Sequence, residues 1–321
     1  MKLLTIDSVR EGAPGALLRS GEVLDLRKAA LPGTVEQWLP DSVRALLEAG
    51  SDGLAIAQRV VSRVEAMTAQ AQQHLRASGA LLPSSTRLQT PVPNPHLVVA
   101  AGLAYRSHLA EMSGTPTPPH PTAFIKSPSS IGRPDGDVVL PSIAAEHVDY
   151  EGELAVVFGR DCHRVSAADA MNCVAGYMAA NDISARDWVT AVWEASTPWD
   201  ARRTWEVNIM GKQFPDFTPL GPVLLTADEV PDVSALHLTT RLNGQVMQSS
   251  DVADLIFSIP ETIAYFSRWY AFRPGDILLT GTPAGVGVGR KPRVFMAPGD
   301  VIEVEISGIG VLQNFICAEA A

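Results

Sequence analysis

Short runs of hydrophobic residues, separated by polar turns, occur along most of the chain and predict β-strands. Two of them precede residue 30, at Lys2–Ile6 and Val23–Leu26. The others begin after residue 96 and cover Leu97–Ala100, Asp137–Leu140, Glu153–Phe158, Leu236–Leu242, Ile277–Thr280 and Val301–Ile306. In the last run, apolar and acidic residues alternate, which is typical of a strand with one buried face. The pattern predicts a largely β protein from residue 97 onward.

Three segments have patterns that predict helices instead. Over Leu54–Leu75, apolar residues recur three or four positions apart, which indicates one amphipathic helix. A serine followed three residues later by an acidic residue is typical of a helix start. This signal occurs at Ser166–Asp169, before a predicted helix over Ala167–Val174, and at Ser258–Glu261.

Turn residues divide the chain into two parts. The Asn-Gly pair within Leu242–Val246 predicts a type I′ hairpin. Proline and serine are frequent over residues 81–96, which indicates a linker. We therefore expect an α+β protein with a small N-terminal α+β domain at residues 1–90 and a larger, β-rich domain at residues 91–321.

Composition narrows the classes of function. The formal net charge is −10 and no run of basic residues occurs, so a nucleic-acid-binding surface is not expected. The three cysteines have no metal-type spacing, and such a low, odd number is typical of a reducing compartment. The first residues become charged before a signal peptide could form, and no apolar run has the length of a membrane helix. These features predict a cytoplasmic protein without membrane contact.

Glu151 and Glu153 carry the first candidate chemistry. They stand at the entrance of a predicted buried strand and point to the same face of it. Two like charges placed together need a positive partner between them. A third carboxylate, Asp182, follows another strand-like stretch, and three carboxylates favour a hard cation such as Mg²⁺ or Mn²⁺. The alternative is a solvated strand entrance; His147 is a further ligand candidate or a surface residue.

His108 and Glu111 form a second candidate pair, three residues apart on a predicted helical turn. A carboxylate beside an imidazole raises its basicity and fixes its tautomer, as a general base that activates water requires. An ordinary surface pair would have the same spacing. Lys212, alone in an apolar stretch, is either a site residue or a surface lysine.

The segment Thr280–Gly287 is rich in glycine and follows a predicted strand. It lacks the pattern of a P-loop, and no helix is predicted after it, so a dinucleotide fingerprint is not supported either. A serine-hydrolase elbow is absent from the chain. We expect this loop to bring backbone groups and the Thr282 hydroxyl close to a ligand.

Several motifs, taken in order, resemble the fumarylacetoacetate hydrolase family over roughly residues 97–316. They are AGLAYRSHLAEM, VDYEGELAVVFGR, GYMAANDISARDW, MGKQFPDFTPLGPVLLT, LNGQVMQ, TGTPAGVG and APGDVIEVEISGIGVLQN. The resemblance implies a mixed β-roll or β-sandwich catalytic domain, a homodimer and one Mg²⁺ or Mn²⁺ ion per subunit. It implies metal ligation by Glu151, Glu153 and Asp182 and catalysis by the His108–Glu111 dyad and Lys212. Substrate contacts are implied for Tyr105, Arg106 and Thr282.

The resemblance also implies a small-molecule oxo acid or diketone as substrate. The first hypothesis is hydrolysis of a carbon–carbon bond in an acylpyruvate-like compound, with water activated by the dyad and the metal acting as Lewis acid. A 2-oxo acid decarboxylase, isomerase or hydratase is the alternative within the same fold. A binding protein without catalytic activity is the alternative from another class.

Two positions differ from the usual family pattern. Ala104 stands where asparagine is common, and Val189 stands where a side-chain amide is common. The adjoining segment carries Trp193, Trp199 and Trp205. Loss of an amide and gain of apolar surface suggest a bulkier substrate, unless the tryptophans simply pack in the core or in a dimer interface.

Overall fold

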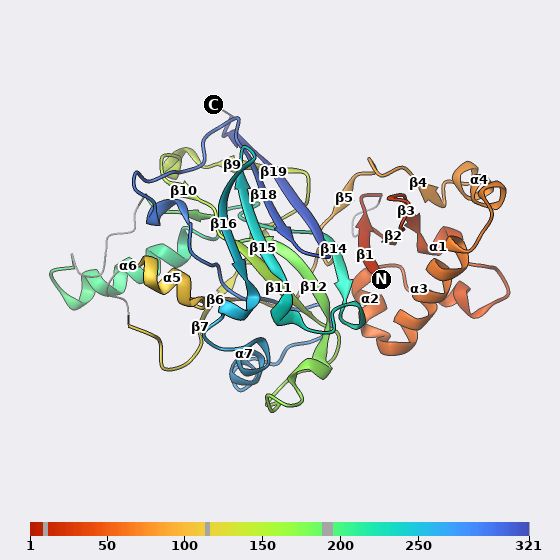
Figure 1. The fold of residues 1–321 in the computed structure, drawn as a ribbon, viewed down its shortest axis with the longest axis horizontal. Helices are drawn as coiled ribbons and strands as arrows, with labels where there is room; N and C mark the ends of the chain where they lie inside the picture. Colours follow the sequence, from red (N-terminus) through yellow and green to blue (C-terminus); the bar gives the residue numbers. More distant parts are fainter. Residues whose placement is uncertain (9–11, 113–115, 188–194, 321) are drawn as a thin grey trace.

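The computed structural model describes residues 1–8, 12–112, 116–187 and 195–320 and has a mixed α and β architecture. Within these residues, a 12-stranded sheet forms the centre and a five-stranded sheet packs against it. In Figure 1 the N-terminal strands and helices lie on the right, and α6 lies at the left end. The expected α+β fold with mixed sheets is confirmed.

The central sheet joins strands from both ends of the chain. Its main order is β4-β3-β2-β1-β14-β12-β11-β17-β6-β7, with β5 beside β1 and β8 beside β14. The bounds are β1 Lys2–Ile6, β2 Ala13–Leu17, β3 Val23–Asp25, β4 Leu81–Leu82, β5 Leu88–Gln89, β6 Val98–Gly102, β7 Thr122–Lys126, β8 Ile131–Gly132, β11 Gly152–Phe158, β12 Val174–Asn181, β14 Thr218–Thr226 and β17 Ile277–Leu279.

The second sheet has the order β16-β15-β18-β19-β9. Its strands are β9 Gly136–Leu140, β15 His237–Leu242, β16 Gln245–Asp251, β18 Val301–Ile306 and β19 Gly310–Ala318. The predicted hairpin is confirmed between β15 and β16, because Asn243 and Gly244 both have positive φ, 52° and 78°, as a type I′ turn requires. A separate ladder pairs β10 (Val148–Asp149) with β13 (Ser184–Ala185).

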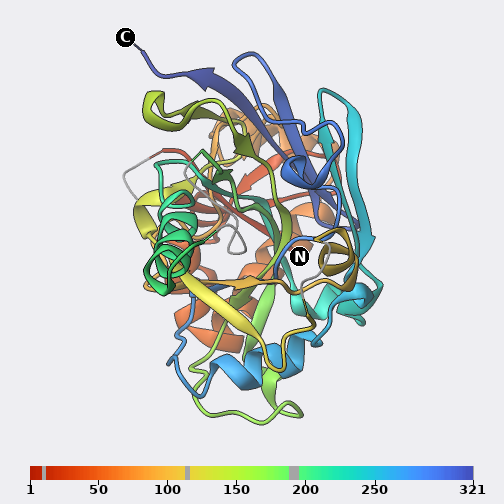
Figure 2. The same cartoon turned by 90° about the vertical axis from the view of Figure 1, so that its left-hand side faces the viewer.

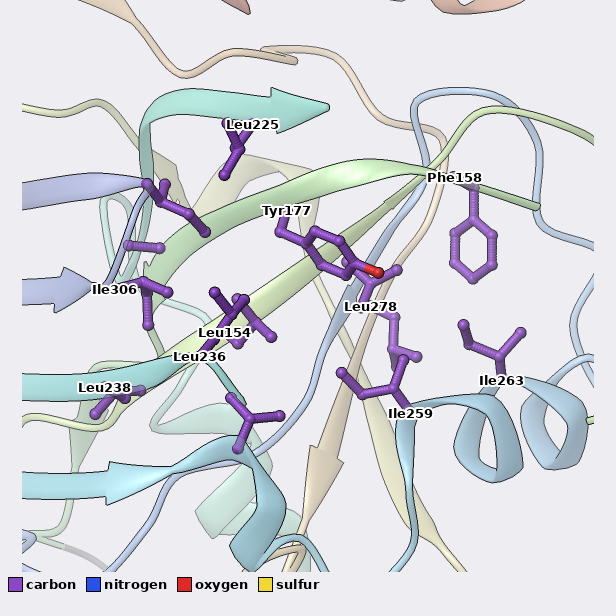
Figure 3. Packing of buried hydrophobic residues seen from close by; sticks show 14 of the residues in the cluster. Leu154, Phe158, Tyr177, Leu225, Leu236, Leu238, Ile259, Ile263, Leu278 and Ile306 are labelled. Atoms are coloured by element: carbon purple, nitrogen blue, oxygen red, sulfur yellow. The ribbon is translucent and has the colours of Figure 1, made fainter. Parts of the chain in front are cut away.

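Both faces of the central sheet are buried, which explains why β11 is an unbroken apolar run from Leu154 to Phe158. Leu154, Val156 and Phe158 pack into the core between the two sheets, which also contains Tyr177, Leu278, Ile306 and Ile259 of α7 (Figure 3). Ala155 and Val157 point to the other face, into a second core shared with the N-terminal helices. Both cores therefore hold β11 and the acidic residues at its start in a fixed position.

Helices pack on both faces of the central sheet. Their bounds are α1 Leu26–Ala29, α2 Val43–Glu48, α3 Gly50–Glu65, α4 Ala69–Ala77, α5 Arg106–Glu111, α6 Pro198–Met210 and α7 Ile259–Phe266. Of these, α2 and α3 lie in the core with Ala155 and Val157, and α7 lies in the core with Leu154 and Val156. Figure 2 shows α6 on the same side of the molecule as β7, where Gln213 Nε2 donates to the carbonyl oxygen of Ile125 at 3.3 Å. No helix in the described part of the chain combines the length and apolarity needed to cross a membrane.

The single helix predicted over Leu54–Leu75 is wrong, because two helices occupy this region. α3 ends at Glu65, and the side chain of Thr68 accepts a hydrogen bond from Ala71 N to start α4. The apolar periodicity of the sequence continues into α4, although α4 has no fully buried residue and so packs little against the core. Periodicity alone does not reveal such an internal cap.

Two further expectations are corrected, and one is confirmed. Residues 81–96 are not a plain linker, because β4 and β5 add short pairs to β3 and β1. The predicted helix over Ala167–Val174 is a 3-10 turn at Ala170–Cys173. The capping box at Ser258 is confirmed at the start of α7.

The domain boundary near residue 90 stays a prediction. Because β1 pairs with β14, the N-terminal part of the chain contributes strands to the central sheet.

Candidate active site

The three predicted metal ligands come together at one end of two paired strands. Glu153 lies in β11, Glu151 immediately precedes it, and Asp182 immediately follows β12. Antiparallel pairing aligns Gly152 with Asn181, and Asp182 N donates to the carbonyl oxygen of Glu151 at 2.8 Å. One carboxylate oxygen from each of Glu151, Glu153 and Asp182 lies within 4.8 Å of the others, and all three residues are buried.

Three cationic side chains surround these carboxylates. Lys212 Nζ donates to Glu151 Oε2 at 2.6 Å and to Asp182 Oδ2 at 2.7 Å. Lys126 Nζ donates to Asp182 Oδ1 at 2.6 Å and is fully buried. Arg186 pairs with Glu151 Oε1 and, at 3.3 Å, with Asp149 Oδ2. The solvated strand entrance that the sequence left open is therefore wrong.

The cluster contains more negative than positive groups. Its acidic members are Asp149, Glu151, Glu153 and Asp182, against the cationic Lys126, Arg186 and Lys212, four against three. Burial together with the charges of Asp182 and Glu151 raises the pKa of Glu153 well above its usual value. Burial alone would also raise the pKa of Glu151, but Lys212 and Arg186 outweigh it and lower this pKa to about 2.

A divalent cation fits this donor set. The three carboxylates are hard oxygen donors, and Glu153 has only the Gly281 amide, at 2.7 Å, as a hydrogen-bond partner in the described structure. A buried carboxylate that has no cation of its own is costly, and a bound ion removes that cost. The residues that would hold the ion are Glu151, Glu153 and Asp182.

The predicted dyad lies on α5, the short helix that follows β6. His108 Nδ1 is 3.3 Å from Glu111 Oε2, and both side chains are largely buried. Gly285 N donates to Glu111 Oε1 at 3.0 Å, so the glycine-rich loop holds the carboxylate from the other side. The same loop donates Gly281 N to Glu153 Oε2 at 2.7 Å, so one glycine-rich segment holds both the dyad and the acidic cluster.

The structure gives Lys212 and Thr282 partners within the protein. All three protons of Lys212 Nζ are donated, the third to Ser184 Oγ at 2.7 Å. Thr282 Oγ1 donates to Gly152 O at 2.9 Å and accepts from Gln248 Nε2 at 2.7 Å. Their implied contacts to substrate stay predictions, and both would need to exchange a partner for substrate.

Tyr105 and Arg106 lie where β6 meets α5. Tyr105 is fully buried, and burial with the nearby charge of Glu153 raises the pKa of its hydroxyl. Arg106 Nη1 donates to Leu255 O at 2.5 Å and Nη2 to Ile256 O at 3.3 Å, so its guanidinium binds backbone carbonyls. A substrate contact by Arg106 stays a prediction.

Sequence reasoning did not select Lys126, Arg186 or Asp149 for the site. Lys126 ends the otherwise uncharged strand β7, and a single lysine there is a detectable signal for a buried cation. Arg186 and Asp149 lie within the selected motifs GYMAANDISARDW and VDYEGELAVVFGR, four residues after Asp182 and two before Glu151. Their role was not visible because it depends on the pairing of β10 with β13.

His147 does not join the acidic cluster. It lies with Glu146 and Asp187, more exposed, and its Nδ1 is 2.9 Å from Asp187 Oδ1. The ring of Phe295 contacts it edge to face at 4.9 Å. The interpretation of His147 as a fourth ligand is therefore replaced by a peripheral ion pair.

The residues that differ from the usual family pattern are only partly described. Ala104 is half-buried and lines a small apolar hollow with Phe257 and Thr262. Val189 and Trp193 lie outside the described residues. Trp199 and Trp205 on α6 are 64% and 48% exposed, so packing in the core does not explain them.

Comparison with known proteins agrees with this geometry. Residues 97–317 match the family model "Fumarylacetoacetate (FAA) hydrolase C-terminal". The chain is 41% identical to mitochondrial oxaloacetate tautomerase FAHD2B of Homo sapiens over 86% of this chain and 80% of that protein. It is 33% identical to oxaloacetate tautomerase YisK of Bacillus subtilis over 98% of this chain and all of that protein.

A solved structure is similar along the whole chain. It is maleylpyruvate hydrolase from Sphingobium sp. SYK-6 in complex with manganese(II) and pyruvate, 26% identical, with a TM-score of 0.70 and 100% of both chains covered. The family model alone spans more than half of the present chain. The chain therefore belongs to the fumarylacetoacetate hydrolase family of enzymes.

Proposed function

We propose that this protein is a divalent-metal-dependent tautomerase that interconverts the keto and enol forms of a 2-oxo acid of the oxaloacetate type. The observation that carries the proposal is the buried cluster of four carboxylates against three cations, with the His108–Glu111 dyad held by the same glycine-rich loop as Glu153. Two relatives that are 41% and 33% identical bear the name oxaloacetate tautomerase, which supports this choice.

The chemistry requires one proton to move between carbon and oxygen. Glu151, Glu153 and Asp182 would hold a cation that would supply Lewis acidity to the oxygens of a 2-oxo acid. His108 uses Nδ1 toward Glu111, which leaves Nε2 to take a proton from the carbon beside the keto group and to deliver it to the enolate oxygen. Glu111, held by Gly285, orients the ring and stabilises its positive charge.

Hydrolysis of a carbon–carbon bond is the second candidate. The same dyad could activate water, and a solved relative is named maleylpyruvate hydrolase. Mg²⁺ and Mn²⁺ are both candidates for the cation, and Mn²⁺ is the ion in that relative. A homodimer is proposed on the family resemblance.

The test follows each product separately. Purified protein with Mg²⁺, Mn²⁺ or a chelator is given oxaloacetate in its enol form, and decay of the enol absorbance is compared with buffer. Proton NMR in D₂O then follows deuterium uptake at the carbon beside the keto group. A tautomerase accelerates both without releasing new acids. In a parallel assay with an acylpyruvate as substrate, an acylpyruvate hydrolase releases pyruvate and a second acid. If neither reaction depends on added metal, the proposed function is wrong.

A further inference from the structure

Asp149 is a fully buried carboxylate that the chemistry above does not use. It lies in β10, opposite Ser184 of β13, and has no exposed surface. Burial raises its pKa despite the neighbouring Arg186. Buried carboxylates persist when several donors satisfy them, so the donors around Asp149 indicate what it does.

On one side, Asp149 holds the glycine-rich loop. Gly287 N donates to Asp149 Oδ1 at 2.6 Å, and Val288 N donates to Oδ2 at 3.1 Å. A Cβ added at Gly287 would lie 2.6 Å from Asp149 Oδ1 and 1.9 Å from Val294 O, so no side chain fits there. The same loop donates Gly285 N to Glu111.

On its other side, Asp149 holds Arg186. The Nε and Nη2 atoms of Arg186 lie 3.4 and 3.3 Å from Asp149 Oδ2. Nη2 also binds Glu151 Oε1. Arg186 therefore shares its charge between two carboxylates, and without Asp149 it would be free to pair with Glu151 alone.

From this network we propose that Asp149 is a positioning residue that connects the loop behind Glu111 with Arg186 and, through it, with Glu151. The inference rests on the proposed function insofar as Glu151 binds a cation. Asp149 takes part of the positive charge of the guanidinium away from Glu151, whose Oε1 binds Arg186 Nη2 and whose Oε2 binds Lys212 Nζ at 2.6 Å. It also fixes the loop whose Gly285 amide orients the dyad.

The test uses Asp149→Asn, which keeps the shape and removes the charge. Calorimetry with Mn²⁺ should show an affinity roughly 10- to 100-fold weaker, the usual cost of losing a residue that orients a ligand. Hydrogen exchange should become faster in the peptide containing Gly285 and Val288. Neither measurement needs a substrate. If the wild-type protein has no tautomerase activity but the Mn²⁺ affinity and the hydrogen exchange change as expected, only the proposed tautomerase activity is contradicted.

Asp276→Asn is the matched control. Asp276 is also buried and accepts three backbone amides, from His96 at 3.0 Å, Leu97 at 2.9 Å and Arg273 at 2.8 Å, but it precedes β17 at the end away from Gly281. It should lower thermal stability while leaving the Mn²⁺ affinity and the exchange of the loop unchanged.

Two results would overturn the inference. One is an Asp149→Asn protein that binds Mn²⁺ as the wild type does; the other is an equal loss of affinity in Asp276→Asn. If Asp149→Asn does not fold, the test uses the wild-type protein alone. Addition of Mn²⁺ should slow hydrogen exchange of the Gly285–Val288 amides, and unchanged exchange would refute the proposed connection between this loop and Glu151.

Discussion

Two buried clusters of charge, one in the N-terminal part and one at the candidate active site, are built in opposite ways. In the first, Glu36 accepts two hydrogen bonds from Arg63, Oε2 from Nη2 at 2.7 Å and Oε1 from Nε at 3.2 Å. The second contains four carboxylates and three cations. The N-terminal pair is balanced, whereas the cluster around Glu153 has an excess of negative charge.

The pKa values of Glu36 and Glu153 differ in the direction that these two balances of charge predict. Burial would raise the pKa of Glu36, but the bonds from Arg63 and Leu31 N outweigh it and leave the pKa below its usual value. The pKa of Glu153 is raised because burial and two neighbouring carboxylates act together. Removing one partner of a balanced buried pair destabilises the fold, whereas an unbalanced cluster costs stability and is retained for binding.

Replacing Glu153 should have the largest effect on activity. In Glu153→Gln, we expect Mn²⁺ binding and tautomerase activity to fall to background, because one of three oxygen donors loses its charge. The metal-free protein should keep or gain thermal stability, since an uncompensated buried carboxylate is removed. Calorimetry and thermal melts measure both, and a clear loss of metal-free stability would contradict the comparison.

Replacing His108 of the dyad should lower the turnover rate without changing the affinity for metal. For His108→Asn we expect turnover to fall by about a hundredfold or more, the range for loss of a general base. The Mn²⁺ affinity should change little, because His108 is not one of the three carboxylate donors. Steady-state kinetics beside calorimetry checks this, and wild-type turnover would remove His108 from the mechanism.

The N-terminal pair should affect stability without affecting activity. For Glu36→Gln we expect a loss of about 1.5–3 kcal/mol in the free energy of unfolding, the range for a hydrogen-bonded charged group. Because the pKa of Glu36 in the folded state lies below its usual value of 4.5, this stability is present above pH 4.5 and is lost as pH falls through the folded-state pKa. Urea unfolding of both proteins at about pH 7 and at about pH 3 tests it; a difference that does not shrink at the lower pH contradicts it.

The smallest effect is expected at the second carboxylate–histidine group. The His147 side chain is 46% exposed, so its pair with Asp187 should contribute about 0–1 kcal/mol. In Asp187→Asn, Mn²⁺ affinity and turnover should stay within about twofold of wild type, which corresponds to less than 1 kcal/mol. A large loss of metal binding would show that exposed acidic groups also take part.

The candidate metal ligands could be selected from the sequence because their signal is local. Glu151 and Glu153 stand two apart at a strand entrance, and Asp182 follows a similar run, so strand geometry already directs them toward a common edge. His108 and Glu111 were accessible for the same reason, through helical spacing. In the structure, one glycine-rich loop contacts both groups.

Other features depended on contacts between distant segments. Lys126 lies 56 residues from Asp182, and only the sheet brings the two to 2.6 Å. The end of α3 at Glu65 was missed because the apolar pattern continued into α4, which buries little. Thr282 looked available for a ligand, but Gln248 and Gly152 take its hydroxyl.

The sequence by itself determined eight of the strands, the type I′ hairpin, and the candidate acidic donors and dyad, because each follows from spacing along a few residues. Tertiary structure decided the balance of charge around those donors. Lys126, Arg186, Lys212 and Asp149 reach them from separate strands and loops. Electrostatic energy depends on distance and burial in space, and neither quantity can be read from positions along the chain.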